Sequence, residues 1–339
     1  MIPGRTPDYD IPSWGESFPL PGFLPLKSGR LRSPASPSRT LLQALLAMPR
    51  DAYVNGRFVP HRQAQVPIED RGFQFSDGVY EVISVVNGQM VDEAGHLDRL
   101  TYSLAELKIA WPMSRRALEQ VIRHLIRRNG LKNGIVYLQI TRGNAPRDFG
   151  FPKAGTRPTL VLTTRRMPRF ASPQQLENGV AVVTVPDIRW QRRDIKSIGL
   201  LAQVLGKQYA RDNGAFEAWL VENGMVNEGC SSNAWIVTTA GVLITQPPSH
   251  HILNGITRQA VLRLARSLHY PLEERTFSLA EAQAAQEAFL TSASTFVMPI
   301  TRIDGQAVGD GRPGPLARAL RLAYLDYAQE LAPAGGASR

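Results

Sequence analysis

The first candidate catalytic residue in this chain is a lysine. Lys196 lies between a β-branched run, 179–185, that predicts a strand and a pattern at 200–213 that predicts a helix. A lysine at such a junction is most often a solvated surface residue. It can also be an amine nucleophile that forms a Schiff base with a carbonyl cofactor, because lysine loses its proton readily when it is desolvated or lies beside another cation. Lys196 alone does not decide between these interpretations.

Two features further along the chain favour the second interpretation. Glu228 follows a hairpin turn predicted at Asn223-Gly224 and precedes a segment of small residues. A helix is predicted to begin just after Gly255, and the free N–H groups of such a helix start form a seat for phosphate. A lysine, an acid and a phosphate seat are the three contacts that pyridoxal phosphate needs. Its aldehyde would form a Schiff base with Lys196, its ring nitrogen would contact Glu228, and its phosphate would bind at the helix start.

Seven short stretches occur in the order in which one enzyme family carries them. They are Glu69–Glu81, His96–Leu100, Thr141–Arg147, Asp187–Trp190, Asp194–Ser197, Glu228–Asn233 and Gly255–Arg258. Together they resemble the fold-type IV pyridoxal-phosphate aminotransferases, most closely the D-amino-acid aminotransferases, over roughly residues 52–330. Any one stretch is a weak motif, whereas seven in order make the resemblance specific.

The resemblance implies a role at the cofactor for eight residues. Lys196 would bind the aldehyde and move the proton of the substrate's α-carbon, and Glu228 would hold a proton on the ring nitrogen. Leu253 would pack behind the ring. The phosphate would be bound by Arg99, Ile256, Thr257, Ser292 and Ala293. Ala293 departs from the hydroxyl residue common at its position, so only its backbone N–H can contribute.

The resemblance also implies a trap for the substrate carboxylate. Tyr80 and Arg147 match the residues that grip this carboxylate in D-amino-acid aminotransferases, and Arg147 would come from the neighbouring subunit of a homodimer. The family often places a histidine two residues after the arginine. Phe149 stands there in this chain, which removes one hydrogen-bond donor from the trap.

Simpler interpretations of several candidates stay open at this stage. Glu228 could be an ordinary turn acid, and Arg99 could pair within its helix, with Asp98 or near Glu106. Leu253 could be plain core. Cys230 is expected to be a small filler beside the cofactor, since no histidine is assigned to activate it as a nucleophile.

Composition limits the class of protein. The chain has 339 residues, one cysteine and a formal net charge of +10. A single cysteine excludes a disulfide framework and a cysteine-rich metal site, and it fits a reducing compartment, so we expect a cytoplasmic protein without a metal. The basic residues are spread along the chain, which favours a solvated surface with some attraction for anionic substrates over nucleic-acid binding. No apolar run approaches membrane-spanning length.

The pattern of elements predicts an α+β protein with two domains and the cofactor between them. Residues 1–50 are rich in proline, and we expect no packed fold there. A small α+β domain is predicted at 51–166, with hairpins at Asn55-Gly56 and Asn87-Gly88 and helices at 96–110 and after Ser114. The predicted remainder is a linker at 167–173, a larger cofactor-binding domain at 174–331 and a tail at 332–339.

These observations predict a ping-pong transaminase that moves an amino group from a D-amino acid to a 2-oxo acid, pyruvate or 2-oxoglutarate, through Lys196. Enzymes of the same fold remain alternatives: an (R)-amine transaminase, a branched-chain aminotransferase or an aminodeoxychorismate lyase. A non-catalytic binding protein on this fold is the alternative from another class. The joint presence of Lys196, Glu228 and Arg99 argues against it.

Overall fold

The computed structural model describes residues 50–331 of the chain. The predicted proline-rich extension, apart from Arg50, and the predicted tail at 332–339 lie outside the described residues. The described residues, 50–331, group as a single compact unit, which contains two separate sheets. The division into domains at 51–166 and 174–331 therefore stays a prediction.

The first sheet has six strands in the order β2-β1-β6-β5-β3-β4, all antiparallel. The predicted hairpin turns are confirmed, because Asn55 and Asn87 both adopt the positive φ that such two-residue turns require. The strands are β1 (Asp51–Val54), β2 (Arg57–Pro60), β3 (Gly78–Val86), β4 (Gln89–Met90), β5 (Gly134–Thr141) and β6 (Thr159–Arg166).

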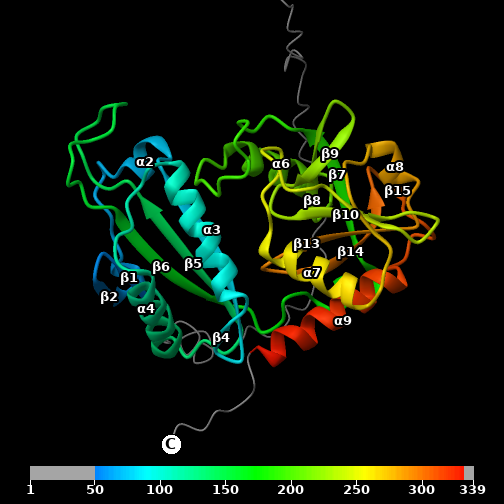
Figure 1. The fold of residues 1–339 in the computed structure, drawn as a ribbon, viewed down its shortest axis with the longest axis horizontal. Helices are drawn as coiled ribbons and strands as arrows, with labels where there is room; N and C mark the ends of the chain where they lie inside the picture. Colours follow the sequence, from blue (N-terminus) through cyan, green and yellow to red (C-terminus); the bar gives the residue numbers. More distant parts are fainter. Residues whose placement is uncertain (1–49, 332–339) are drawn as a thin grey trace, which may run out of the picture. The chain divides into compact units, whose positions relative to one another are not determined.

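Two long helices pack on this sheet (Figure 1). They are α3 (Glu93–Glu106) and α4 (Arg115–Arg128), and the short elements η1 (His61–Gln63) and α2 (Arg71–Phe75) precede them. Leu97, Leu100 and Leu104 of α3 are fully buried against the strands, as their spacing predicts. Ser114 caps α4 with its side chain, which confirms the predicted start.

Helix α3 ends earlier than predicted. Lys108 adopts φ +53, and the N–H of Ile109 donates to the carbonyl of Leu104 at 2.9 Å while the N–H of Lys108 donates to Ala105. This pair of bonds is a Schellman motif, which closes a helix through one left-handed residue. Glycine usually takes that position, and Gly130 does so after α4 with φ +51. A lysine at this position gave no signal, so the predicted helix ran on to Ala110.

The second sheet has nine strands, in the order β12-β11-β10-β13-β14-β7-β8-β9 with β15 on β14. Two pairs near its centre, β14 with β7 and β7 with β8, are parallel. The strands are β7 (Val180–Pro186), β8 (Glu217–Glu222), β9 (Met225–Gly229), β10 (Asn233–Val237), β11 (Leu243–Thr245), β12 (Leu272–Glu274), β13 (Glu287–Ser292), β14 (Phe296–Ile303) and β15 (Gln306–Ala307).

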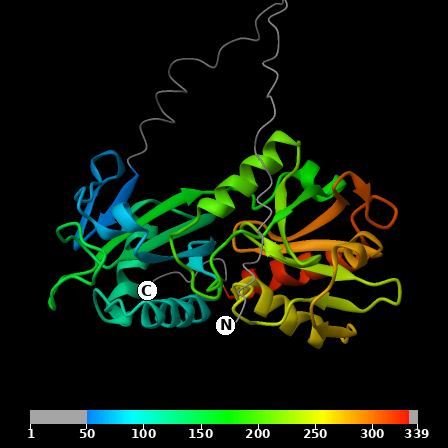
Figure 2. The same ribbon diagram turned by 90° about the horizontal axis from the view of Figure 1, so that it is seen from above.

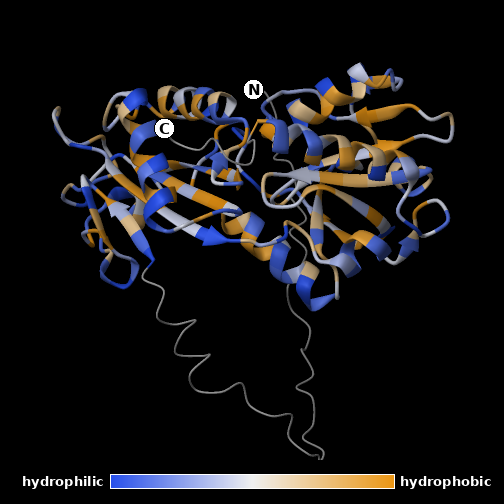
Figure 3. Ribbon diagram, turned by 90° about the horizontal axis from the view of Figure 1, so that it is seen from below, coloured by the Kyte–Doolittle hydropathy of each residue, from blue (hydrophilic) through white to orange (hydrophobic). Residues whose placement is uncertain are grey.

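Helices cover both faces of the second sheet. The apolar core residues on α7 and α9 pack with strand residues in one cluster, and those on α8 pack with strand residues in another. The five helices are α5 (Pro173–Asn178), α6 (Leu201–Asp212), α7 (Ile256–Ser267), α8 (Leu279–Gln283) and α9 (Pro315–Glu330). Pro173, predicted as the end of the linker, is instead the first residue of α5, because Ser172 forms a capping box with Gln175. Apolar stretches run along many strands of both sheets (Figure 3).

The crossover between β7 and β8 places Lys196. Two parallel strands need a connection that returns across the sheet, and here α6 supplies it. The loop 187–200 leaves the carboxyl end of β7, where ligands commonly bind in parallel sheets. This loop and α6 lie where the two sheets face each other (Figure 1, Figure 2). No helix among residues 50–331 is long and apolar enough to cross a membrane.

Candidate active site

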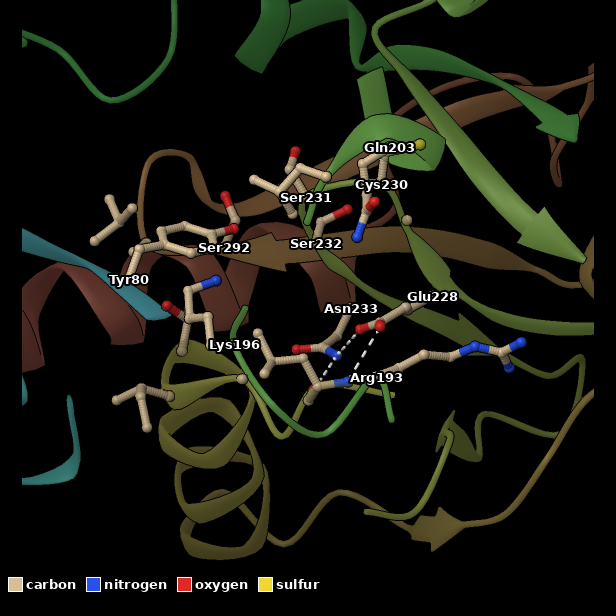
Figure 4. Close-up of a pocket in the computed structure, with 18 of the residues that line it drawn as sticks. Tyr80, Arg193, Lys196, Gln203, Glu228, Cys230, Ser231, Ser232, Asn233 and Ser292 are labelled. Atoms are coloured by element: carbon tan, nitrogen blue, oxygen red, sulfur yellow. Dashed lines mark hydrogen bonds between the residues drawn. The ribbon is translucent and has the colours of Figure 1, made fainter. Parts of the chain in front are cut away.

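One pocket brings together nine of the eleven predicted site residues (Figure 4). Its walls come from β3, α3, the loop 187–200, the segment after β9, the start of α7 and the turn after β13. The predicted residues that line it are Tyr80, Arg99, Lys196, Glu228, Leu253, Ile256, Thr257, Ser292 and Ala293. Arg147 and Phe149 do not line it.

Lys196 is fixed by its backbone and free at its amine. Its carbonyl accepts the N–H of Tyr80 at 3.0 Å, and its own N–H donates to Ser103 Oγ at 3.2 Å. Its Nζ lies 4.1 Å from the centre of the Tyr80 ring and forms no ion pair with any residue of the described range. A partly buried amine without a carboxylate partner is suited to act as a nucleophile.

Glu228 presents a buried carboxylate to the pocket. Its Oε1 accepts bonds from Arg189 Nη1 at 2.5 Å and from the N–H of Leu253 at 3.1 Å, and its Oε2 accepts from Asn233 Nδ2 at 3.0 Å. Burial raises the pKa of Glu228 above its ordinary value, and the Arg189 guanidinium limits this rise. The simpler interpretation of Glu228 as an exposed turn acid is wrong, since its side chain is 5% exposed.

Arg189 is a site residue that the sequence analysis did not assign. Its side chain is 6% exposed and links two acids, because Nη1 bonds Glu228 while Nε and Nη2 bond Asp187 at 2.9 and 2.8 Å. Asp187 also accepts a bond from Asn227 Nδ2 at 2.9 Å. The signal in the sequence is the stretch Asp187–Trp190, one of the seven that carry the resemblance, because it contains this arginine.

Arg99 is held by an acid from the neighbouring strand. Its Nε and Nη2 each donate to Glu81 at 2.8 Å, and Nη1 donates to the carbonyl of Asn254 at 3.2 Å. His96 Nδ1 lies 2.8 Å from the same carboxylate. The alternative pairing of Arg99 with Asp98 or Glu106 is wrong, because Arg115 and Arg192 bind those acids.

This pairing orients the Arg99 guanidinium at the pocket wall. Glu81 is fully buried, and the adjacent Arg99 and His96 hold its pKa well below the ordinary value although burial opposes them. A guanidinium has five N–H groups, so two remain for a ligand after the three bonds to protein. The alternation along β3 indicates that Glu81 is buried, because it shares the core-facing side of the strand with Val79 and Ile83. An acid at such a position needs a buried partner, and Arg99 on α3 is that partner.

The start of α7 is open for an anion. Gly255 is its N-cap, and no side chain caps the amides of the first turn. A Cβ at Gly255 would come within 2.0 Å of Asn233 Oδ1, so only glycine fits beside the asparagine that also binds Glu228. Ile256 and Thr257 follow with their side chains buried, and both line the pocket.

The turn after β13 forms another part of the pocket wall. Ser84 Oγ donates to the carbonyl of Ala293 at 2.5 Å, which ties this turn to β3. Ser292 Oγ lies 2.8 Å from Thr295 Oγ1 and 3.3 Å from Ser294 Oγ. Ala293 brings no hydroxyl group, and Ser294, which also lines the pocket, is a hydroxyl residue that the sequence analysis did not assign.

Arg147 and Phe149 lie on a loop away from the pocket. The Arg147 guanidinium packs over the rings of Phe75 and Phe149, with its central carbon 5.1 and 5.7 Å from their centres. Phe149 is 79% exposed. Within one chain these residues therefore do not reach Lys196, and their predicted role depends on a second copy.

Cys230 lines the pocket as a partly buried residue, and burial raises the pKa of its thiol to about 12. Its sulfur packs against Gly206 of α6, where a Cβ would approach within 2.6 Å. A thiol with this pKa is protonated at neutral pH, so it is a poor nucleophile. This observation agrees with its predicted place as a small filler.

The donor set of this pocket fits pyridoxal phosphate. It offers an amine without an ion pair, a buried carboxylate for the ring nitrogen, and a cluster of amides and one arginine for the phosphate. No group of His, Cys, Asp and Glu residues that could hold a metal ion occurs among residues 50–331.

Comparisons with known proteins agree with this geometry. The family model for amino-transferase class IV matches residues 78–303. A D-alanine aminotransferase of Bacillus licheniformis is 42% identical over 269 residues, which cover 79% of this chain and 94% of that protein. One of Staphylococcus haemolyticus is 37% identical over 275 residues, which cover 81% and 96%.

Solved structures of branched-chain amino acid aminotransferases share the fold. That of Escherichia coli has a TM-score of 0.78 at 23% identity and covers 85% of this chain and 98% of its own. That of Thermobaculum terrenum, in its PLP-form, has a TM-score of 0.71 at 25% identity, over 85% and 95%. The α+β fold predicted from the sequence is confirmed.

Proposed function

This chain belongs to the class IV aminotransferase family, and we propose that it transfers the amino group of a D-amino acid to a 2-oxo acid with pyridoxal phosphate as cofactor. One observation carries the proposal: a single pocket joins Lys196, the buried carboxylate of Glu228 and an open helix start beside Arg99. Relatives named D-alanine aminotransferases, at 37–42% identity, support a D-amino acid as the donor.

The catalytic group in this proposal is Lys196. Pyridoxal phosphate, when bound, supplies an aldehyde that reacts with amines and a ring that withdraws electrons from the substrate's α-carbon. Lys196 Nζ would hold this aldehyde between turnovers. It would take the α-proton of the amino donor in the first half of the reaction and deliver a proton to the α-carbon of the acceptor in the second half. Its Nζ lies over the Tyr80 ring, 4.1 Å from the centre, and no carboxylate of the described residues binds it. The absence of an ion pair supports this role, because the amine is not held as a paired cation.

The remaining residues bind and orient the cofactor. Glu228 keeps a proton on the ring nitrogen, supported by Arg189, and Leu253 packs behind the ring. Three groups of residues bind the phosphate in this proposal. They are Ile256 and Thr257 at the start of α7, Ser292 and Ala293 at the turn after β13, and Arg99 with its two free N–H groups. Residues of both predicted domains, 51–166 and 174–331, line the pocket, which supports a cofactor bound between them.

A homodimer completes the site in this proposal. Helix α6 exposes an apolar stripe at the spacing of one helical face, formed by Leu201, Val204, Leu205 and Tyr209. Exposed apolar stripes of this kind mark interfaces. Phe149, which packs against the Arg147 guanidinium, is exposed, and so are Phe73 of α2 and Phe151. A loop of this kind is suited to enter the partner's pocket, where Arg147 and the partner's Tyr80 would bind the substrate carboxylate.

Subunit complementation tests the origin of Arg147. Lys196→Ala and Arg147→Ala chains are each expected to be defective alone. If Arg147 acts across the interface, unfolding and refolding the two together restores one intact site in every mixed dimer. Random assortment then gives about a quarter of wild-type activity. Equal amounts of either variant refolded alone serve as controls, and a mixture no more active than they are contradicts the shared site.

The choice of substrate is tested by assays with both enantiomers of alanine. We expect pyruvate from D-alanine only when 2-oxoglutarate is present, because a transaminase needs an acceptor. Pyruvate release from aminodeoxychorismate without an acceptor would indicate a lyase. L-leucine as the better donor would indicate a branched-chain enzyme, and no turnover of any donor would indicate a binding protein. We also propose a cytoplasmic location, supported by the free Cys230.

A further inference from the structure

A second cavity lies between α9, the segment 168–176 and the end of β3. Its volume is ≈ 650 Å³, within the range of about 300–1,000 Å³ that is usual for small-molecule sites. It shares no lining residue with the cofactor pocket. Apolar side chains form most of its wall: Val86, Phe170, Leu176, Phe296 and Leu325.

The cavity also contains a buried arginine without an acid. Arg321 of α9 is 8% exposed. Its hydrogen bonds leave from Nη1, to the carbonyls of Thr295 at 2.7 Å and Val297 at 2.5 Å, while Nε has no acceptor. Burial alone lowers its pKa to about 10, and no carboxylate opposes this change.

Arg321 is an exception within the described part of the chain. The other four buried arginines there each have a carboxylate within 2.8 Å: Arg71 and Arg142 on Asp77, Arg193 on Glu222, and Arg258 on Glu274. A buried charge without a counter-ion is costly, so proteins rarely retain one that has no partner. None of the residues that line the cavity is acidic, and Arg169 adds a second cation to its wall.

We propose that this cavity is a second ligand site, for a small monocarboxylate with an apolar body. The carboxylate would pair with Arg321, and its body would pack against Phe170 and Phe296, whose ring centres are 4.2 Å apart. A monocarboxylate fits better than phosphate or a dicarboxylate, because apart from the two arginines the wall is mainly apolar.

A ligand in this cavity would change how tightly the cofactor pocket binds its cofactor, a consequence that rests on the proposed function. Arg321 holds the carbonyls of Thr295 and Val297, on either side of Phe296, a non-glycine residue with φ +60. The same turn carries Ser292 and Ala293 into the cofactor pocket. A carboxylate that competes for Arg321 would therefore change the affinity of the protein for the cofactor, and the cofactor would change the affinity for the carboxylate by the same factor.

The test uses the holoenzyme, with phenylacetate as probe and phenylacetamide as its uncharged counterpart in isothermal titration. Phenylacetate has neither an amino nor an oxo group, so it cannot react at Lys196. Three variants separate the possible sites. Arg321→Met removes the charge. Leu325→Trp fills the cavity without touching the arginine's bonds, and Leu322→Trp, on an exposed position of the same helix, is its control.

We expect phenylacetate to bind the wild type at least roughly tenfold more tightly than phenylacetamide. Leu325→Trp and Arg321→Met should each weaken phenylacetate by a similar factor, and Leu322→Trp should leave it unchanged. If Arg321→Met fails to fold, Leu325→Trp decides the question alone. No binding to the wild type would overturn the proposal. Binding that Leu325→Trp leaves intact would also overturn it, because the probe would then occupy another site, such as the cofactor pocket. The titration does not depend on transaminase activity, so the two proposals can fail separately.

Discussion

Replacing Arg189 by methionine should shift the pH dependence of the enzyme in a defined direction. Arg189 Nη1 lies 2.5 Å from Glu228 Oε1, and both side chains are almost fully buried. Methionine removes the guanidinium and keeps much of the apolar stem. Glu228 then keeps its bonds from the Leu253 N–H and Asn233, and Asp187 keeps Asn227 as a partner. The variant therefore removes the charge–charge contact with Glu228 together with the two bonds to Asp187.

The size of the effect follows from the strength of that contact. A hydrogen bond between charged groups contributes about 1.5–3 kcal/mol, and one pH unit corresponds to about 1.4 kcal/mol. Arg189 stabilises the ionised carboxylate, so its loss raises the pKa of Glu228 further above the ordinary value. A protonated Glu228 cannot act as the anion beside the ring nitrogen. The acid limb of the kcat/KM profile for D-alanine should move upward by roughly one to two pH units.

Arg193→Met is the matched control. Arg193 lies on the same loop, is equally buried and binds Glu222 at 2.8 Å without a bond to Glu228. Its removal should lower stability and leave the acid limb in place. An unchanged acid limb in Arg189→Met, or an equal shift in the control, would refute the reasoning.

The apoprotein gives a second readout of the Arg189 contact. A carboxyl group whose folded pKa is raised weakens the fold as pH rises from its unfolded pKa, about 4.3, to its folded pKa. Arg189→Met raises the folded pKa of Glu228 further. The stability deficit of the variant relative to wild type, measured by urea unfolding, should therefore grow as pH rises from the folded pKa of Glu228 in the wild type to its higher folded pKa in the variant. A deficit that is constant with pH would show that Arg189 does not act on the charge of Glu228.

The remaining predictions concern Glu81, which holds Arg99, and the two residues of the proposed carboxylate trap, Arg147 and Phe149. Glu81→Gln should destabilise the apoprotein by about 3–5 kcal/mol in urea unfolding, because it leaves Arg99 without its buried partner. Since the folded pKa of Glu81 is depressed, this deficit should stay full above about pH 4.3 and shrink only as pH falls toward the folded pKa; a deficit that vanishes near pH 7 would contradict the pairing. Arg147→Ala should raise the KM for D-alanine roughly tenfold or more, whereas Phe149→His should lower it about fivefold by adding one donor worth about 1 kcal/mol. Turnover of (R)-1-phenylethylamine as efficient as that of D-alanine would contradict the carboxylate trap and favour an amine transaminase.

Residues typical of turns and helix ends predicted many of the element boundaries. Asn-Gly pairs placed the hairpins, and Ser114 and Gly130 marked the two ends of α4 correctly. The end of α3 was missed because Lys108 takes a left-handed conformation that glycine usually takes. The next residue, Ile109, is buried in the same apolar cluster as Leu104, and its N–H donates to the Leu104 carbonyl, so the helix end is fixed by a core that forms only on folding.

The candidate site was predictable for residues with a proposed role at the cofactor, and it was not predictable for the residues that hold them in place. Lys196, Glu228 and Arg99 followed from motifs in order along the chain. Glu81 and Arg189 did not, because their function depends on pairings with Arg99 and Glu228 that are 18 and 39 positions away in sequence. Arg321 had no motif at all, and its lack of an acid became visible only in three dimensions.

The central claim, that Lys196 binds the cofactor, is tested most directly by reduction of the purified holoenzyme with borohydride and mapping of the modified peptide. The protein should be yellow before reduction, lose its visible band on treatment, and carry the phosphopyridoxyl group on Lys196 alone. Lys196→Ala should retain some cofactor through the phosphate contacts but gain no covalent label. Recovery of the label on another lysine, or on none, would contradict the account.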